Sequence, residues 1–410
     1  MTNFSDEFLK DIPKTDLHTH LDGGIRLSTL IDIAKEQKIT LPSYTEEGLR
    51  EKVYKKRYAD LPDYLQGFQY TIAVSQTPEA LERIAYEMAF DNFDEGVCYF
   101  EPRFAPQLHA NPSMNVDEVL ISVNKGLARA KKEINSRKEI KDGELPRFEY
   151  GIIGCAMRMF KAQGTGYYHR LMEMHPYMPE EEMQGLASID LVRALVHARD
   201  VNAIPIAGFD LAGAERGYPA ETHRKSYELA LKHFLKKTVH AGEDYGPASI
   251  FQAITDCHAD RIGHGTHIFD ADLVELPTKE EREKYARDLW EYIADRRITI
   301  EVCLTSNLQT MPNLKSIKDH PLAKMLDKRI SVTFCTDNRL ISNTNVTNEV
   351  KLAVSNFEIH SRKLKDLIIY GFKRSFFPGD YMEKRKYVRK VIDHYEKMEA
   401  KHGVKSSKKQ

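Results

Sequence analysis

The feature that most constrains this chain is a regular alternation of short apolar runs with stretches of helical period. Each run is followed by a loop and then by apolar residues at three- and four-residue spacing. The candidate strands are Thr15–His18, Val97–Arg103, Phe148–Ala156, Ala203–Asp210, Thr238–His240, Arg261–His264, Ile298–Cys303 and Val332–Thr336. Parallel strands joined by helical crossovers give this order, so the eight runs predict an α/β fold, a (β/α)8 barrel of the TIM type.

Two crossovers are long enough to carry extra helices. One covers residues 25–92, after the first strand, and the other covers residues 161–201. From residue 348 onward the apolar spacing predicts a helical C-terminal segment. No Gly-, Ser- or Pro-rich linker interrupts these segments. We therefore expect one barrel domain over residues 1–400, followed by a basic, flexible tail over residues 401–410.

Composition and charge narrow the class of protein. Among the 410 residues, 60 Lys plus Arg balance 61 Asp plus Glu, so no basic surface for nucleic acid or a membrane is expected. The chain shows no signal-peptide pattern and no run of the roughly 18 to 20 apolar residues that a membrane span needs. The five cysteines lack CxxC spacing, which predicts neither disulfides nor a thiolate metal site. We expect a cytoplasmic protein with a small-molecule ligand, and its oligomeric state stays open.

The segment TDLHTHLDG places His18 and His20 two residues apart at the end of the first candidate strand. Residues two apart on a strand share a face, so both imidazoles can reach one metal ion, and neutral imidazole suits zinc. Taken alone, such a pair is more often surface or packing histidine. Its position strengthens the metal interpretation, because barrel active sites form at the carboxyl ends of the strands.

The segment TVHAGED ends another candidate strand with His240 and places Glu243 three residues later. His240 can supply a third imidazole. Glu243 would lie beside the metal on the following loop, where partial burial raises the pKa of a carboxyl enough for general acid catalysis. The alternative for Glu243 is an exposed residue at a helix start, where it favours the helix dipole.

Two further strand ends carry His264 and Asp337. His264 lies between two glycines in DRIGHGTH, which allow close backbone approach to a ligand. Asp337 follows an apolar run in SVTFCTDN and can add an oxygen ligand, although an Asp-Asn turn is the alternative for Asp337 and Asn338. Four of the eight strands thus end in His or Asp, in the order HxH, H, H and D, which chance explains poorly.

With these motifs the chain resembles the adenosine deaminase family, within the metal-dependent amidohydrolase superfamily. The segments TDLHTHLDG, YFEPRFAP, FDLAGAE, HAGED, RIGHGTH, VCLTSN, CTDN and SFFP occur in the family's order over nearly the whole length, and NRLISNT is similar to a bacterial-type branch. The resemblance implies one Zn²⁺ per chain, with the ligands His18, His20, His240 and Asp337.

The resemblance also implies the roles of the residues around the zinc. Glu243 would protonate purine N1, and His264 would orient or deprotonate the attacking water. The substrate would be bound by His20, by Asp22 at the ribose hydroxyls, by the backbone N–H of Gly213 at N3, and by Asn338.

The chemistry agrees with these roles. Zinc lowers the pKa of a bound water toward about 7, and a proton on N1 makes C6 of the purine ring electrophilic enough for attack. We therefore expect hydrolysis of adenosine to inosine and ammonia, with 2′-deoxyadenosine as a second substrate.

Two positions depart from the family's pattern. Asn338 stands where the best-known members carry a second aspartate, which leaves the preferred nucleoside open. Its amide NH2 can donate to an unprotonated purine N7 at any pH. Leu304 replaces a common proline and is expected to affect loop shape only.

Other functions remain as alternatives. Adenine or a modified adenine nucleoside can undergo the same chemistry, although Asp22 argues against adenine because adenine-specific relatives resemble HxEG at this position. A non-catalytic nucleoside-binding protein would be expected to lack Glu243 or a metal ligand. IAGFDLAG holds no lysine for a second metal, and the HxE and PCxxC pattern of nucleic-acid deaminases is absent.

Two other sets of residues could be taken for functional residues. Glu101 and Arg103 are expected to form an interior ion pair with a structural role. The tyrosine-rich region from Tyr54 to Tyr70 is predicted to be helix packing, with an apolar lid over the purine as the alternative.

Overall fold

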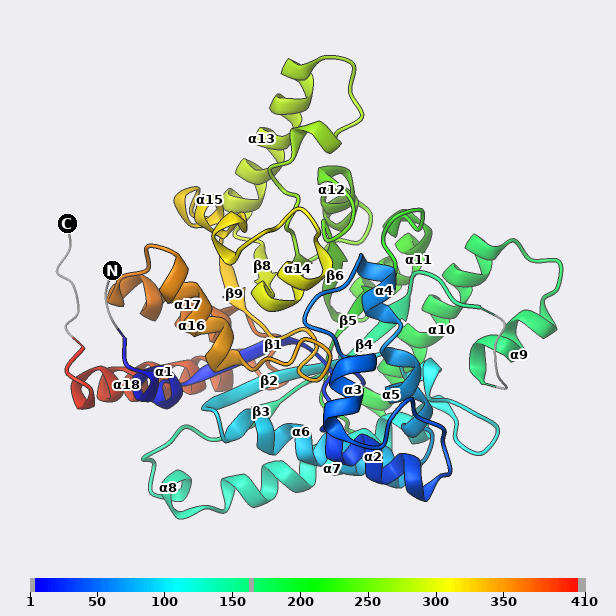
Figure 1. Cartoon of the computed structure of the whole chain (residues 1–410), viewed down its shortest axis with the longest axis horizontal. Helices are drawn as coiled ribbons and strands as arrows, with labels where there is room; N and C mark the ends of the chain where they lie inside the picture. Colours follow the sequence, from blue (N-terminus) through cyan, green and yellow to red (C-terminus); the bar gives the residue numbers. More distant parts are fainter. Residues whose placement is uncertain (1–3, 162–165, 405–410) are drawn as a thin grey trace.

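The computed structural model describes residues 4–161 and 166–404, and its centre is a parallel β-barrel enclosed by helices (Figure 1). All pairings between neighbouring strands are parallel. The strands are β1 (Lys14–His20), β2 (Val97–Phe104), β3 (Glu149–Tyr150), β4 (Ile152–Met157), β5 (Ile206–Ala212), β6 (Lys236–Ala241), β7 (Arg261–His264), β8 (Thr299–Val302) and β9 (Val332–Phe334). The predicted eight-stranded TIM-type barrel is confirmed.

The barrel closes between its first and last strands. The strand order is β1-β2-β4-β5-β6-β7-β8-β9, with the short β3 paired to β2. Thr19 and Asp337 form the isolated parallel bridge between the two ends of this order. There the His20 N–H donates to the Asp337 carbonyl at 2.7 Å, and the Asp337 N–H donates to the His18 carbonyl at 2.8 Å. The closing seam therefore runs through three residues that were predicted to bind metal.

Two strands differ from the predicted runs for local reasons. The run Phe148–Ala156 divides into β3 and β4 at Gly151, where a Cβ would lie 2.6 Å from the Ala207 Cβ, so the backbone approaches too closely for any side chain. Strand β5 begins at Ile206 instead of Ala203, because Ala203 has a φ of 53° and Pro205 has no N–H to donate to a neighbouring strand.

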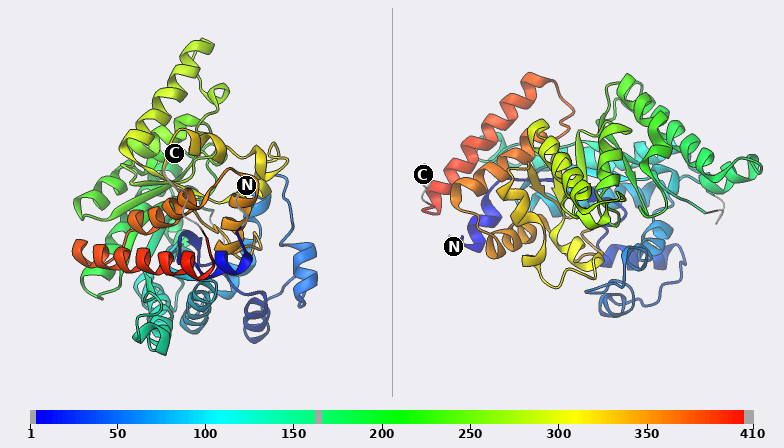
Figure 2. Two further views of the ribbon diagram at one scale, coloured as in Figure 1. Left: turned by 90° about the vertical axis from the view of Figure 1, so that its left-hand side faces the viewer. Right: turned by 90° about the horizontal axis from the view of Figure 1, so that it is seen from above.

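Helices surround the barrel on all sides (Figures 1 and 2). The α-helices are α1 (Asp6–Asp11), α2 (Leu27–Glu36), α3 (Glu46–Lys52), α4 (Leu61–Leu65), α5 (Phe68–Val74), α6 (Pro78–Phe93), α7 (Val116–Asn135), α8 (Lys138–Lys141), α9 (Tyr167–Met174), α10 (Glu180–Asp200), α11 (Arg224–Lys232), α12 (Pro247–Thr255), α13 (Lys279–Arg296), α14 (Leu304–Thr310), α15 (Leu322–Asp327), α16 (Val346–Asn356), α17 (Ser361–Arg374) and α18 (Tyr381–Lys401). Short 3₁₀ helices are η1 (Pro106–Leu108), η2 (Ala220–His223), η3 (Ala271–Leu273) and η4 (Ile317–Asp319). Helices α2 to α6 form the predicted insertion after the first strand, and α9 and α10 form the second.

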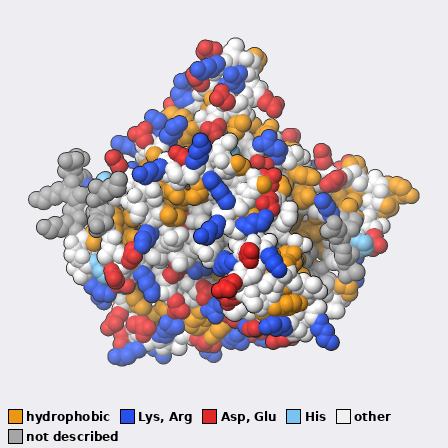
Figure 3. All heavy atoms as spheres, in the orientation of Figure 1, with side chains coloured by type: hydrophobic (Ala, Val, Ile, Leu, Met, Phe, Trp, Pro, Cys, Tyr) orange, Lys and Arg blue, Asp and Glu red, His pale blue; other side chains and the backbone are white. Residues whose placement is uncertain are grey.

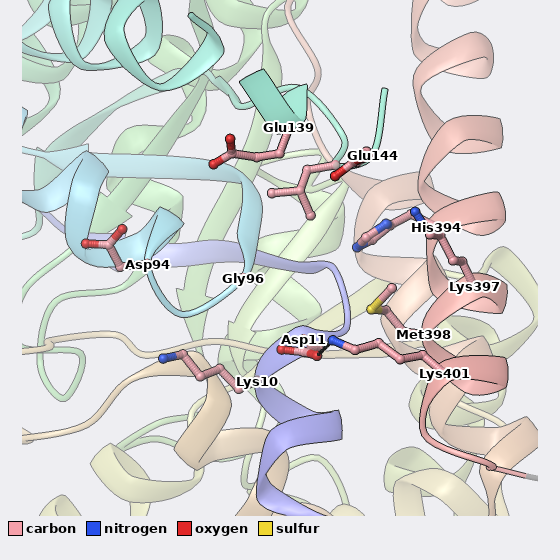
Figure 4. Close-up of a pocket in the computed structure, with 11 residues that line it drawn as sticks. Lys10, Asp11, Asp94, Gly96, Glu139, Glu144, His394, Lys397, Met398 and Lys401 are labelled. Atoms are coloured by element: carbon pink, nitrogen blue, oxygen red, sulfur yellow. Dashed lines mark hydrogen bonds and ion pairs between the residues drawn. The ribbon is translucent and has the colours of Figure 1, made fainter. Parts of the chain in front are cut away.

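The C-terminal helix α18 packs against α1 at the amino-terminal ends of the strands. Helix α18 ends at Lys401, whose Nζ lies 2.6 Å from Asp11 Oδ2, and His402 Nε2 lies 2.8 Å from the same oxygen. The flexible tail over residues 401–410 stays a prediction, and its residues 405–410 lie outside the described residues. A surface cleft of about 490 Å³ lies at this junction. Its lining carries charged groups of both signs (Figure 4). It lies at the opposite end of β1 from His18 and His20.

The surface carries interspersed positive and negative side chains on the face drawn in Figure 3. Exposed apolar side chains gather at the tip between α9 and α10, where Met174 and Tyr177 project from the molecule. All five cysteines are free and buried. In the part of the chain that the structure describes, no helix combines the length and the apolar character that crossing a membrane requires.

Candidate active site

Four side chains from different strands converge at the carboxyl ends of the barrel strands. His18 lies on β1, His240 on β6 and His264 at the end of β7, and Asp337 follows β9. One nitrogen or oxygen atom from each of these four side chains lies within 4.8 Å of the others, and all four residues are buried. The parallel barrel explains this convergence, because it brings the carboxyl ends of all its strands to one rim.

His20 and Glu243 lie at the border of this cluster. His20 Nε2 is 3.1 Å from His240 Nε2 and 3.4 Å from Asp337 Oδ1. Glu243 Oε2 is 3.6 Å from His264 Nε2. The six residues singled out in the sequence for metal binding and catalysis are therefore brought together in space.

The arrangement fits a divalent metal ion with nitrogen and oxygen ligands. His18 Nδ1 lies 2.9 Å from Glu301 Oε2, and His240 Nδ1 lies 3.1 Å from Asp210 Oδ2. A carboxylate accepts a proton on Nδ1, so each ring turns an unprotonated Nε2 toward the cluster, as histidines that bind metal do. The buried Nε2 of His18 has no hydrogen-bond partner among the described residues. A metal ion at this point would satisfy it.

The supporting carboxylates belong to a buried ionic layer across the barrel. Arg103 contacts Asp210 and Glu301 at 2.9 Å each, and Arg261 contacts Glu301 at 2.6 Å. Arg261 also pairs with Glu101. The expected Glu101–Arg103 pair is wrong, because each residue pairs with a partner on another strand. The interior location and structural role of both charges are as expected.

Two cluster residues adopt backbone conformations that cost free energy. His264 and Asp337 have φ values of 64° and 60°, in the left-handed region that residues with side chains rarely occupy. Both conformations turn the side chain inward at the end of a strand. Gly263 has a different role from the one expected: a Cβ there would lie 3.0 Å from His18 Cε1, so this glycine makes room for the His18 ring and not for a ligand.

Burial sets the protonation of the groups beside the cluster. Burial first, and then the negative charges of Asp337 and Glu215, raise the pKa of Glu243 well above its usual range. Glu243 therefore keeps its proton at a pH at which exposed glutamates are ionised. Burial also lowers the pKa of His264 well below its usual range, so this imidazole is neutral.

One carboxylate organises the loop that carries Glu243. Glu215 follows β5 and accepts hydrogen bonds from the backbone N–H groups of four consecutive residues, 242–245, at 2.7 to 3.1 Å. Ser249 Oγ donates to it as well. Glu215 thus joins the loop after β5, which holds Gly213, to the loop after β6.

The residues expected to bind substrate lie around the same rim. Gly213 has a φ of 100°, and a Cβ there would lie 3.3 Å from Met157 Cε. Asn338 is buried beside Gly23, where any side chain would collide with Asn338 Oδ1. Asp22 Oδ2 lies 3.8 Å from His109 Nε2. Within the described chain, neither Asp22 Oδ1 nor His109 Nε2 has a hydrogen-bond partner.

Part of the tyrosine-rich region lies against the cluster. Tyr64 is buried, and its hydroxyl is 2.8 Å from Ser342 Oγ on the loop after β9. The Phe68 ring lies edge-on to His20, with 6.3 Å between ring centroids. Helices α4 and α5 therefore supply an apolar wall beside His20 as well as helix packing.

Comparison with known proteins agrees with this geometry. The adenosine deaminase family model matches residues 13–394. An adenosine deaminase from Mycobacterium avium is 36% identical over 377 residues, which cover 91% of this chain and 93% of the relative. This chain belongs to the adenosine deaminase family.

Solved structures show the same fold at lower sequence identity. An amidohydrolase from Burkholderia ambifaria, with bound zinc, has a TM-score of 0.76 at 18% identity and covers 98% of this chain and 97% of its own. The N6-methyl-AMP deaminase from Arabidopsis thaliana has a TM-score of 0.71 at 22% identity, with coverages of 95% and 98%. Both solved structures therefore share the fold of this adenosine deaminase family member.

Several residues of the site were not found from the sequence. Five of them contact predicted residues, and the sixth, His320, contacts Asn307. The five are Glu301, Asp210, Asn307, Glu215 and His109. Glu301 and Asp210 lie within apolar strands, where a charged residue is rarely buried without a partner. That conflict was a usable signal for these two. Glu215 and Asn307 lie within the segments FDLAGAE and VCLTSN that carry the family resemblance, whereas His109 and His320 carried no signal.

Proposed function

We propose that this protein hydrolyses adenosine, and also 2′-deoxyadenosine, releasing ammonia from C6 of the purine. The observation that supports this most is the buried, protonated Glu243 placed 3.6 Å from His264 at the edge of a metal-type cluster. His18, His20, His240 and Asp337 would hold one Zn²⁺. When bound, zinc supplies an activated water at neutral pH.

The protein groups would act on the purine and on the departing amine. Glu243 holds the proton that N1 must receive before C6 can be attacked. The carboxylate left behind can take a proton from the attacking water and pass that proton to the departing amino group. His264 faces Glu243 across the cluster and interacts with the attacking oxygen. Buried walls around these groups exclude bulk water, which strengthens each hydrogen bond.

The residues expected beside the ribose favour an unphosphorylated nucleoside. His109 Nδ1 lies 3.1 Å from the Ser75 carbonyl, which can only accept, so in the neutral ring this nitrogen carries the proton and Nε2 is an acceptor. Asp22 offers only acceptors beside it. Hydroxyl groups donate to such a pair, whereas a phosphate would be repelled by the carboxylate.

Two alternatives use the same barrel. Adenine or a modified adenine nucleoside would undergo the same reaction, but adenine leaves the two acceptors of Asp22 and His109 unused. A protein that only binds nucleosides would not require the buried acid at position 243.

We also propose a cytoplasmic location, because five free buried cysteines suit a reducing compartment.

The test measures ammonia release by zinc-loaded protein with adenosine, 2′-deoxyadenosine, adenine and AMP in parallel. We expect rapid turnover of the two nucleosides, loss of turnover on chelation, and a kcat about 10³-fold lower in Glu243→Gln. Preferred turnover of adenine or AMP would overturn the substrate assignment. Tight binding of adenosine without ammonia release would overturn the enzyme assignment.

A further inference from the structure

The three histidines of the cluster differ in what touches their second ring nitrogen. His18 and His240 each face a carboxylate at Nδ1. His264 Nδ1 instead lies 3.1 Å from the side-chain amide nitrogen of Asn307, on α14. A carboxylate accepts a proton from the ring, whereas an amide NH2 donates one to it. The contact on His264 therefore has the opposite polarity.

The orientation of the Asn307 amide is fixed by a second buried histidine. His320, directly after η4, places Nε2 3.2 Å from the Asn307 side-chain oxygen. The backbone N–H of Leu322 donates to His320 Nδ1 at 3.1 Å. A backbone N–H can only donate, so His320 Nδ1 must be unprotonated and its Nε2 must carry the proton. That proton requires an oxygen opposite it, and so the NH2 of Asn307 must face His264.

The hydrogen bonds from His320 through Asn307 to His264 form a relay. This relay determines which nitrogen of His264 carries the proton. Nδ1 receives a hydrogen bond from Asn307 and is unprotonated, so the proton of the neutral ring lies on Nε2. His264 Nε2 is buried and has no hydrogen-bond partner within the described residues. It points toward Glu243 and the cluster. A protonated nitrogen cannot bind a metal ion, which leaves His18, His20, His240 and Asp337 as the ligand set.

We propose that Asn307 and His320 are positioning residues that hold His264 in the Nε2–H tautomer, so that His264 acts as a hydrogen-bond donor to the attacking oxygen. His264 then orients this oxygen and stabilises the negative charge that develops on it. It does not remove a proton from the water. The inference about the reaction rests on the proposed function, whereas the tautomer itself does not.

The first experiment reads the tautomer without any turnover. Two-bond ¹H–¹⁵N correlation spectra of ¹⁵N-histidine-labelled, metal-free protein, assigned with His264→Gln, distinguish Nε2–H from Nδ1–H. We expect Nε2–H for His264 in the wild-type protein and Nδ1–H in Asn307→Asp, because a carboxylate accepts the proton from Nδ1. An Nδ1–H signal in the wild-type protein would overturn the proposal.

The second experiment measures kcat and KM with the zinc-loaded variants. We expect Asn307→Asp to lower kcat about 100-fold with KM changed less than about threefold, since a lost transition-state donor costs roughly this factor. His320→Gln keeps both an acceptor for Leu322 and a donor for Asn307, so kcat should stay within about threefold. His320→Leu should lower kcat by at least about tenfold.

The outcomes distinguish the loss of the relay from a general loss of stability and from a failure of the proposed function. Zinc content and melting temperature should match the wild-type values in all three variants. Equal losses in His320→Gln and His320→Leu would overturn the relay, as would full activity of Asn307→Asp. A wild-type protein that turns over no purine would refute the proposed function, but the spectrum would still test the tautomer.

Discussion

Asn338 is the residue at which this chain departs from the best-known members of the family that it resembles. The side chain is buried next to Gly23, and its neighbour Asp337 lies in the metal-type cluster. An amide can donate one hydrogen bond to purine N7 without first taking up a proton, which a carboxylate must do. The asparagine is therefore compatible with the proposed contact to N7, and it carries no negative charge.

The proposed hydrogen bond between Asn338 and purine N7 can be tested separately from the rest of the site. In Asn338→Ala, kcat/KM for adenosine should fall about tenfold, the loss expected for one hydrogen bond of about 1 to 1.5 kcal/mol. For 7-deazaadenosine, which has a carbon in place of N7, the same variant should change kcat/KM or the inhibition constant less than about twofold. Steady-state kinetics with both compounds provide the measurement. Equal losses for the two compounds would refute the contact with N7.

At the scale of elements, the loops after β5 and β6 behave as one unit because Glu215 joins them. One carboxylate accepts four backbone N–H groups and the Ser249 hydroxyl. This bonding fixes the path of the loop that carries Glu243. It also ties that loop to Gly213, on the opposite side of the expected purine.

Replacing Glu215 should lower kcat through its effect on the position of Glu243. In Glu215→Gln an NH2 would face backbone N–H groups, so the loop must rearrange, and we expect kcat to fall about 10- to 100-fold with zinc content unchanged. The double variant with Glu243→Gln should be no slower than Glu243→Gln alone, since residues that act as a unit are not additive. Losses that multiply in the double variant would argue for an independent role.

A matched control is available nearby on the chain. Glu221, in η2, is exposed and lies 3.6 Å from Arg224. Glu221→Gln should leave kcat, KM and zinc content unchanged, because exposed ion pairs contribute little free energy.

The elements were largely predictable from apolar periodicity, since each predicted run overlaps a strand. Strand ends were less predictable: β5 begins three residues later than expected because Ala203 adopts a left-handed φ. The predicted site residues meet because a barrel gathers strand ends. The contacts of Asn307 with His320 could not be predicted, because they depend on how α14 and η4 pack, which no local pattern specifies.

At the scale of the whole molecule, the buried ionic layer connects barrel stability to the metal-type cluster. Glu301 on β8 contacts Arg103 on β2, Arg261 on β7 and His18 on β1. All four side chains are at most 1% exposed. The Glu301 carboxylate therefore bridges two buried arginines and orients a cluster histidine.

Glu301→Gln should lower both the stability of the barrel and the affinity of the cluster for zinc. We expect the free energy of unfolding of the metal-free protein to fall by about 3 to 5 kcal/mol, because Arg103 and Arg261 each lose one of their two buried carboxylate partners. Zinc affinity should fall about 10- to 100-fold, since Glu301 supports His18. Chemical denaturation and zinc titration measure the two effects.

Glu149 offers the comparison for Glu301. Its partners Lys131 and Arg147 are partly exposed, with side-chain exposures of 38% and 49%. Glu149→Gln should cost no more than about 1 kcal/mol and leave zinc affinity unchanged. If both variants cost the same free energy, the special role of the buried layer is refuted.

The burial of all five cysteines has a practical consequence for labelling. Burial raises the pKa of Cys98 and Cys257 to about 12 and those of the other three thiols well above their usual range, so none of them is a ready nucleophile. Helix α13 stands out from the barrel (Figure 1), and Glu283 on it is exposed. A cysteine introduced there by Glu283→Cys would be the preferred site for maleimide dyes, spin labels or surface attachment. The native thiols need not be removed first.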